Sequence, residues 1–134
     1  MRNFISILLL MLSLESDAVN NYSSEELLKA QEQGVVIIDI RTPQEWLAQG
    51  IIPNAKRIMF FDQNRKPVVN KFLTEFQKIV ISKDQEFILV CRSGTRTGAA
   101  TRFLEEKMGY KNAGHLEKGM VQWLMENRTI EKIK

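Results

Sequence analysis

The sequence predicts a single α/β domain with a parallel sheet, and two apolar runs with helical segments around them carry that prediction. Residues 35–40 are mostly β-branched and residues 87–90 are wholly apolar, as expected of strands that are covered on both faces. Segments with helix-start signals and helical apolar spacing lie before, between and after these runs. Strands that alternate with helices in this way usually form a parallel sheet.

Two helices of the N-terminal half are predicted from their first turns. Ser23 and Glu26 have the spacing of a capping box and begin the first helix. The tetrapeptide Thr-Pro-Gln-Glu at 42–45 has a cap residue, a proline at the first helical position and an acid in the first turn, so we expect a short helix over 43–49. We interpret its acid, Glu45, as a helix-start residue that pairs with a neighbouring base.

The rest of the chain continues the alternation of strands and helices. Phe72, Phe76 and Val80 fall on one face at helical spacing, and Asn70 can cap the helix that holds them. The other expected elements are, in chain order, a strand over 55–59, a loop over 62–67, a helix over 97–108, a strand over 112–116 and a helix over 119–127.

Residues 1–18 are predicted to be a signal peptide, which leaves 19–134 as the domain. Arg2 gives a positive start, the following stretch to Leu14 is almost wholly apolar, and small residues precede the expected cleavage site after Ala18. About eleven apolar residues suit a signal peptide and are too few to span a bilayer. We therefore expect a periplasmic or secreted protein with no stable membrane span once processed. The alternative is an uncleaved N-terminal helix, either a short membrane anchor or part of the fold. If residues 1–18 are not a signal peptide, a cytoplasmic protein is expected.

The charge pattern argues against a nucleic-acid partner. Beyond residue 18 the chain has 18 basic and 14 acidic side chains, a net charge of +4. Its basic residues are scattered and form no stripe with interleaved aromatic residues, which is what nucleic-acid binding would require. The surplus of positive charge mildly favours anionic ligands.

Cys91 is the only cysteine of the chain, which excludes an internal disulfide, a Cys-x-x-Cys redox pair and a multi-cysteine metal site. We expect neither a metal nor a cofactor. A lone cysteine is often a small buried hydrophobic residue, but this one ends a predicted strand and begins a short polar loop. Successive N–H groups of such a loop, together with the N-terminus of the next helix, are expected to surround the sulfur and favour the thiolate.

The residues after this predicted nucleophile suit the binding of an anionic substrate. Gly94 allows a tight backbone turn, and Ser93 and Thr95 add hydroxyl donors. Arg96 is predicted to clamp a bound oxyanion through two parallel hydrogen bonds, the alternative being a structural ion pair. Arg92 either binds the anion or points outward and steers it.

Polar residues also follow the other apolar run. Asp39 and Arg41 should lie near Cys91, because ligands of open α/β sheets bind outside the carboxyl ends of the strands. We interpret both as supporting residues whose role is chiefly structural, bonding loops together. The sole histidine, His115, could lie near the site, but no partner for it is identifiable and no general-base triad is recognisable.

These segments together resemble the rhodanese family of sulfurtransferases. The matching segments are Asp-Ile-Arg-Thr-Pro-Gln-Glu-Trp at 39–46, Gly-Ile-Ile-Pro-Asn-Ala at 50–55, Cys-Arg-Ser-Gly-Thr-Arg at 91–96, and Leu116 with Gly119 and Trp123. The resemblance implies a rhodanese-like single domain with a small, mostly parallel five-stranded sheet flanked by helices.

The resemblance also implies a reaction. The Cys91 thiolate would take the outer sulfur of a small anionic donor such as thiosulfate, and the resulting persulfide would pass this sulfur to a thiol or cyanide acceptor or to a sulfur-accepting protein. The loop from Arg92 to Arg96 would bind the donor and stabilise the persulfide. Three residues depart from the family pattern, Ile51 in place of histidine and Asn54 and Lys118 in place of glycine, and none of them belongs to this loop.

Two other functions stay open. The first is a phosphatase or arsenate reductase, which holds a tetrahedral oxyanion in a related cradle formed by a cysteine, a loop and an arginine. In such cradles five residues separate the cysteine from the arginine, whereas four residues separate Cys91 from Arg96. Because one residue adds up to about 3.5 Å of chain, the shorter loop favours a single sulfur atom. The other alternative is a non-enzymatic binding module on the same fold, which would typically lack the cysteine or its arginines.

Overall fold

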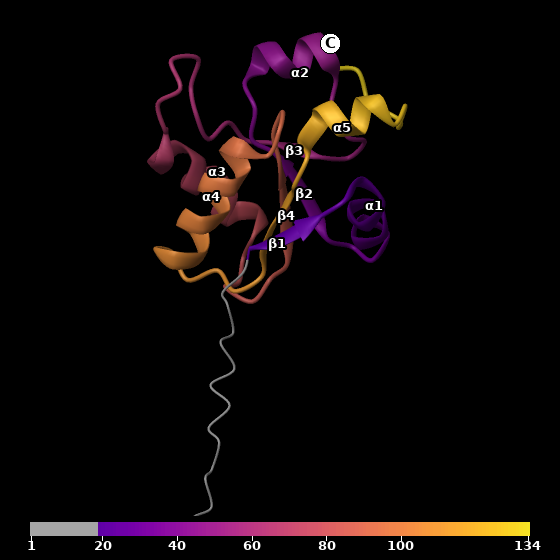
Figure 1. The fold of residues 1–134 in the computed structure, drawn as a ribbon. Helices are drawn as coiled ribbons and strands as arrows, with labels where there is room; N and C mark the ends of the chain where they lie inside the picture. Colours follow the sequence, from indigo (N-terminus) through magenta and orange to yellow (C-terminus); the bar gives the residue numbers. More distant parts are fainter. Residues whose placement is uncertain (1–18) are drawn as a thin grey trace, which may run out of the picture.

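The computed structural model describes residues 19–134, and the predicted signal peptide over 1–18 lies outside this range. The strands are β1 (Asn20–Tyr22), β2 (Val36–Asp39), β3 (Lys56–Arg57), β4 (Phe87–Val90) and β5 (Ala113–Leu116). They form one sheet in the order β1-β5-β4-β2-β3 (Figure 1), and every pairing between these strands is parallel. The predicted α/β class and the five-stranded sheet are confirmed.

Helices cover both faces of the sheet (Figure 1). They are α1 (Ser24–Glu32), α2 (Pro43–Gln49), α3 (Val69–Ile79), α4 (Thr95–Glu106) and α5 (Gly119–Met125). Side chains of α3 and α4 share one buried apolar cluster with the sheet, and side chains of α1, α2 and α5 share the other. No helix within residues 19–134 has the length and hydropathy needed to cross a membrane.

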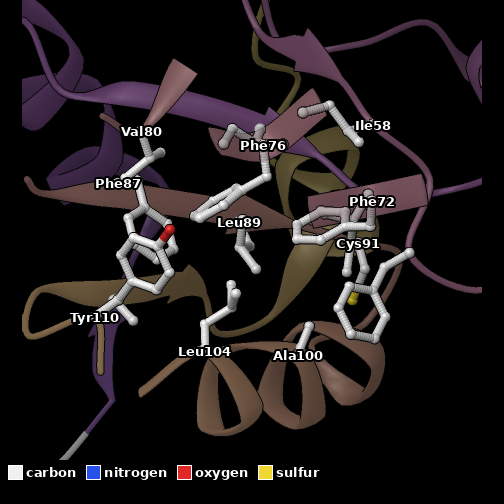
Figure 2. Close-up of a cluster of buried hydrophobic side chains, with 14 residues drawn as sticks. Ile58, Phe72, Phe76, Val80, Phe87, Leu89, Cys91, Ala100, Leu104 and Tyr110 are labelled. Atoms are coloured by element: carbon white, nitrogen blue, oxygen red, sulfur yellow. The ribbon is translucent and has the colours of Figure 1, made fainter. Parts of the chain in front are cut away.

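The central strand β4 divides its side chains between the two apolar clusters. Phe87 and Leu89 belong to the cluster under α3 and α4, and Ile88 and Val90 belong to the opposite one, as the two-residue period of a strand requires. Cys91 continues the first series, so its side chain points toward the helices α3 and α4 (Figure 2). The nucleophile predicted from the sequence is therefore 1% exposed.

Two helices begin at other residues than the sequence predicts. The cap predicted at Asn70 is wrong: α3 begins at Val69, and no side chain within residues 19–134 caps it. The helix after Cys91 begins at Thr95 rather than at residue 97, because Gly94, with φ of 94°, already serves as the cap residue. The polar loop that follows β4 is correspondingly shorter.

The edge strand β1 was not expected from the sequence. It pairs with β5 through Asn20 opposite Gly114 and Tyr22 opposite Leu116. Its residues are polar and mostly exposed, so it lacks the apolar pattern by which a strand is recognised. Its pairing with β5, rather than a pattern of its own, identifies this segment as a strand.

Candidate active site

The carboxyl ends of β2 and β4 bring the predicted site residues to one edge of the sheet. Asp39 lies opposite Val90 in the parallel register, and the N–H of Ile40 donates to the carbonyl of Val90 at 2.9 Å. Asp39 and Arg41 therefore leave β2 beside the point where Cys91 leaves β4. This is the juxtaposition expected from the sequence.

The Cys91 sulfur lies between the apolar core and the loop that follows it. Apolar side chains of α3 and α4 surround it on one side, among them Phe72 and Ala100 (Figure 2). On the other side the backbone N–H of Gly94 donates to Sγ at 3.1 Å, and the hydroxyl of Thr97 lies 3.4 Å from Sγ. Among the described residues, Gly94 thus supplies the backbone hydrogen bond to the sulfur, where the sequence suggested several N–H groups.

The start of α5 holds the loop in this conformation. The N–H groups of Met120 and Val121 donate to the carbonyls of Cys91 and Arg92 at 2.9 and 3.0 Å. Two glycines allow this close approach, since a Cβ on Gly119 would overlap the carbonyl of Arg92, and a Cβ on Gly94 would overlap that of Glu117. The carbonyls of Cys91 and Arg92 are thus bound to α5, and the loop is held in the conformation in which Gly94 donates to the sulfur.

Arg96 is engaged by a carboxylate that comes from α2. Its two terminal nitrogens donate to the two oxygens of Glu45 at 2.6 and 2.7 Å, and both side chains are 25% exposed. Glu45 also completes a capping box with Thr42 at the start of α2. The sequence predicted that Arg96 clamps an oxyanion, with a structural ion pair as the alternative. In the structure Arg96 makes the ion pair, with Glu45.

The pKa values of this pair reflect their contact. Burial raises the pKa of Glu45, but the hydrogen bonds and the charge of Arg96, together with hydrogen bonds from Thr42, outweigh burial and hold it below its ordinary value. The pKa of Arg96 is raised, first by its hydrogen bonds to Glu45, against the opposing effect of burial, and further by the negative charges of Glu45 and Asp39 and of Cys91 when it is a thiolate. Both groups are charged at neutral pH.

Asp39 and Arg41 form a buried network beneath the loop. The guanidinium donates to both carboxylate oxygens at 2.8 to 3.1 Å, and it also donates to the carbonyl of Gly50 at 2.7 Å and to the side chain of Gln49 at 2.8 Å. The indole of Trp46 donates to Asp39 at 3.0 Å. Arg41 is 0% exposed and Asp39 1%, so these contacts join β2 to the end of α2, which is the structural role that the sequence favoured.

A pocket of about 690 Å³ opens beside the loop. The loop and the start of α4 contribute Arg92, Ser93, Thr95 and Arg96 to its lining. The segment between β3 and α3 contributes a second wall, formed by Phe61, Asp62, Gln63 and Arg65. The start of α2 contributes the remaining side, formed by Thr42, Gln44 and Glu45.

Arg65 and the other residues of this second wall are missing from the sequence-based site. Their segment was predicted only as a polar loop. The signal that could have identified it is its position after β3, since the carboxyl end of that strand lies at the same edge of the sheet as Cys91. Arg65 adds a second exposed cation to the pocket beside Arg92.

His115 has a partner that the sequence did not reveal. The histidine lies on β5, opposite Leu89 of β4, and its Nδ1 is 2.7 Å from the hydroxyl of Thr97. Since that hydroxyl also contacts the Cys91 sulfur, His115 is connected to the predicted nucleophile through one intervening side chain.

Comparison with known proteins shows which family this chain belongs to. The family model for the rhodanese-like domain matches residues 23–126. The chain belongs to the rhodanese-like domain family. The family assigned by resemblance is thus confirmed, and the loop that begins at Cys91 lies within the matched range.

Relatives and solved structures share most of this rhodanese-like chain. A sulfurtransferase of Allochromatium vinosum is 33% identical over 107 residues, which cover 78% of this chain and 88% of the relative. The protein YtwF of Bacillus subtilis is 30% identical over 115 residues, with 86% and 97% covered. The crystal structure of a rhodanese-related protein from Thermoplasma volcanium has a TM-score of 0.62 at 23% identity, with 84% of this chain and 97% of that chain covered, and shares the fold.

Proposed function

We propose that this protein is a sulfurtransferase that moves a sulfane sulfur from a small anionic donor such as thiosulfate to a thiol or cyanide acceptor through a persulfide on Cys91. The observation that carries the proposal is the position of the Cys91 sulfur. It accepts the Gly94 N–H at 3.1 Å under a loop whose other residues line a pocket with two exposed arginines.

The reaction consists of two displacements. The Cys91 thiolate attacks the outer sulfur of the donor, a new S–S bond forms, and sulfite leaves with the electron pair of the broken S–S bond. A thiolate or cyanide then attacks the outer sulfur of the persulfide, and Cys91 leaves again as a thiolate. Splitting one transfer into two easier steps is the general advantage of a covalent intermediate.

The exposed charges of the pocket suit a dianionic donor, since its two carboxylates, Glu45 and Asp62, are only partly exposed and accept hydrogen bonds from the protein. Arg92 and Arg65 are exposed and line the pocket, so they can attract the anion and hold its sulfonate end. The sulfur itself needs a hydrogen-bond donor rather than a full charge, and Gly94 supplies one. A sulfur-accepting protein could approach over the same pocket, where its anionic groups would meet the same two arginines.

The ion pair of Arg96 argues against a phosphatase. In an oxyanion cradle the guanidinium charge faces the bound anion, whereas both terminal nitrogens of Arg96 donate to Glu45, whose carboxylate balances that charge and would repel a phosphate. Together with the four residues between Cys91 and Arg96, this favours transfer of a single sulfur atom over binding of a tetrahedral phosphate.

Intact mass spectrometry tests the proposal directly. The purified protein is incubated with thiosulfate, and we expect a mass gain of one sulfur atom that is lost again on addition of cyanide, with thiocyanate as product. Cys91→Ser should fold and show neither mass gain nor thiocyanate. Turnover by this variant, or hydrolysis of a phosphate ester by the unmodified protein, would contradict the proposal.

We also propose that residues 1–18 direct export and are removed after Ala18. The basis is the positive start and the short apolar stretch of this segment. The mass of the protein isolated from its native source would then lack these residues. A full-length mass in the native material would overturn the proposal.

A further inference from the structure

Three polar side chains form a hydrogen-bonded chain that starts at the Cys91 sulfur. Sγ lies 3.4 Å from the hydroxyl of Thr97, this hydroxyl lies 2.7 Å from Nδ1 of His115, and Nε2 of His115 lies 2.9 Å from Oδ1 of Asn21. Thr97 is 0% exposed and His115 7% exposed. This series of hydrogen bonds leads from α4 through β5 to β1, which is the edge strand that the sequence did not predict.

The donor and the acceptor of each hydrogen bond in this series can be assigned by starting from Asn21. The carbonyl oxygen of Asn21 can only accept, so Nε2 of His115 carries the proton and Nδ1 is free to accept. The hydroxyl of Thr97 therefore donates to Nδ1, and the carbonyl of Gly94, at 3.2 Å, is its more distant alternative acceptor. The lone pairs of the same hydroxyl then face the sulfur and can accept a proton from the thiol.

We propose that Thr97 and His115 form a proton relay that deprotonates Cys91 for its attack on the donor and returns the proton when the sulfur has been passed on. Thr97 contacts the reacting sulfur itself, and His115 is a positioning residue that acts through it. The deprotonation does not depend on the nature of the donor, and only the return step rests on the proposed sulfur transfer.

The relay conserves protons at each step. The thiol proton moves to the hydroxyl oxygen of Thr97 while the hydroxyl proton moves to Nδ1 of His115, which gives a thiolate and an imidazolium bridged by a neutral hydroxyl. Nδ1–H then donates to Thr97, and Thr97 donates to the thiolate. When the acceptor takes the outer sulfur, the released thiolate recovers its proton along the same path.

The surroundings of His115 keep the ring in the accepting form at neutral pH. Burial lowers its pKa below the ordinary 6.5, the negative charge of Glu117 opposes this effect, and the positive charge of Arg102 adds to it. The neutral ring can take a proton from Thr97. A thiolate at Cys91 is the additional negative charge that stabilises the imidazolium once it has formed.

Because of the composition of the chain, spectroscopic signals of the relay can be attributed to single residues. There is one cysteine and one histidine, so the ultraviolet absorbance of the thiolate reports Cys91 alone, and the imidazole ring resonances in the NMR spectrum report His115 alone. Neither measurement requires a donor. Failure of sulfur transfer with intact titrations would contradict only the proposed function.

The decisive variant is Thr97→Val, which removes the hydroxyl and keeps the branched shape. We expect the ratio of thiolate to thiol near neutral pH to fall by about tenfold, since a hydrogen bond to a charged group is lost. Thr97→Ser keeps the hydroxyl and should retain most of the thiolate. Thr101→Val is the matched control, because Thr101 is 0% exposed on the same helix and donates to the carbonyls of Thr97 and Gly98.

A second measurement holds even if Thr97→Val fails to fold. The titration of His115 is compared between the unmodified protein and Cys91→Ala, and we expect it to move to lower pH when the thiolate can no longer form. An unchanged His115 titration, or a folded Thr97→Val with as much thiolate as Thr101→Val, would overturn the relay.

Discussion

Glu45 and Arg96, 51 positions apart in the chain, form a two-point ion pair that joins the first turn of α2 to the first turn of α4. The same carboxylate caps α2 through Thr42. One side chain therefore fixes the start of one helix and orients the helix that begins at the site. The loop from Cys91 owes part of its shape to a residue far away in the sequence.

Replacing Glu45 should weaken the fold in a pH-dependent way. We expect Glu45→Gln to lower the free energy of unfolding by about 1–3 kcal/mol at pH 7, because hydrogen bonds between charged groups are lost. The pKa of Glu45 in the folded protein lies below its ordinary 4.5. The contribution of Glu45 to the free energy of unfolding is therefore complete above pH 4.5, the ordinary pKa. It is lost as the pH falls through the lower pKa that Glu45 has in the folded protein.

Urea unfolding across the pH range measures this difference. Glu75→Gln is the control, since Glu75 and Lys78 form an ion pair with side chains 54% and 65% exposed, and such pairs contribute little. If Glu45→Gln lowered the free energy of unfolding as much at pH 3 as at pH 7, the ion pair with Arg96 would not be the source of the stabilisation.

Gly94 should tolerate no side chain. In Gly94→Ala the new Cβ would overlap the carbonyl of Glu117 at a backbone φ of 94°, so we expect a large loss of stability and of the hydrogen bond to Cys91. Gly109→Ala separates the two effects, because Gly109 has φ of 77° and, apart from Gly109 itself and its two chain neighbours, no atom of the described part of the chain lies within 4 Å of the position of a Cβ. That control should show only the backbone strain, about 1–2 kcal/mol. Equal thermal unfolding midpoints of the two variants would show that the contact with Glu117 is unimportant.

The buried pair of Asp39 and Arg41 should be indispensable for folding. Removing one partner leaves an uncompensated buried charge, so Asp39→Asn is expected to cost about 3–5 kcal/mol, measured by denaturant unfolding. Asp84→Asn is the matched control, because the ion pair of Asp84 with Lys111 is 76% and 74% exposed. If both substitutions changed stability equally, the buried network would not have the structural role assigned to it.

The two exposed arginines of the pocket should control donor binding. We expect Arg65→Gln and Arg92→Gln each to raise KM for thiosulfate several-fold and to leave kcat largely unchanged, because their charge attracts the anion before and during the transfer alike. Steady-state kinetics at low and moderate salt measure this, and added salt should reduce the difference. Lys107→Gln is the control, an exposed cation that does not line the pocket. An equal KM for all three variants would remove both arginines from donor binding.

The helices and strands that could be predicted from the sequence are those with a recognisable pattern in their own residues. The strands β2 and β4 are apolar because they are buried on both faces, and α2 begins with a cap, a proline and an acid that act within one turn. The site was recognisable for the same reason. Cys91 and its loop are contiguous, and they directly follow a strand that is itself easy to recognise.

The partners of the site residues could not be predicted in this way. Nothing near Arg96 in the sequence indicates that Glu45 will occupy its guanidinium, and nothing near His115 indicates Thr97 or Asn21. Each of these contacts joins elements that become neighbours only when the sheet has formed. The pocket wall with Arg65 depends likewise on where the segment after β3 lies.

By itself the sequence determined the α/β class, the family resemblance and the position of the single thiol, because hydrophobic periodicity, helix capping and a contiguous loop are local properties of the chain. Only the tertiary structure decided that β1 completes the sheet, that Arg96 binds Glu45 and that Cys91 is linked to His115. The physical reason is that a hydrogen bond depends on distance in space, and the parallel order of β1, β5, β4 and β2 sets those distances.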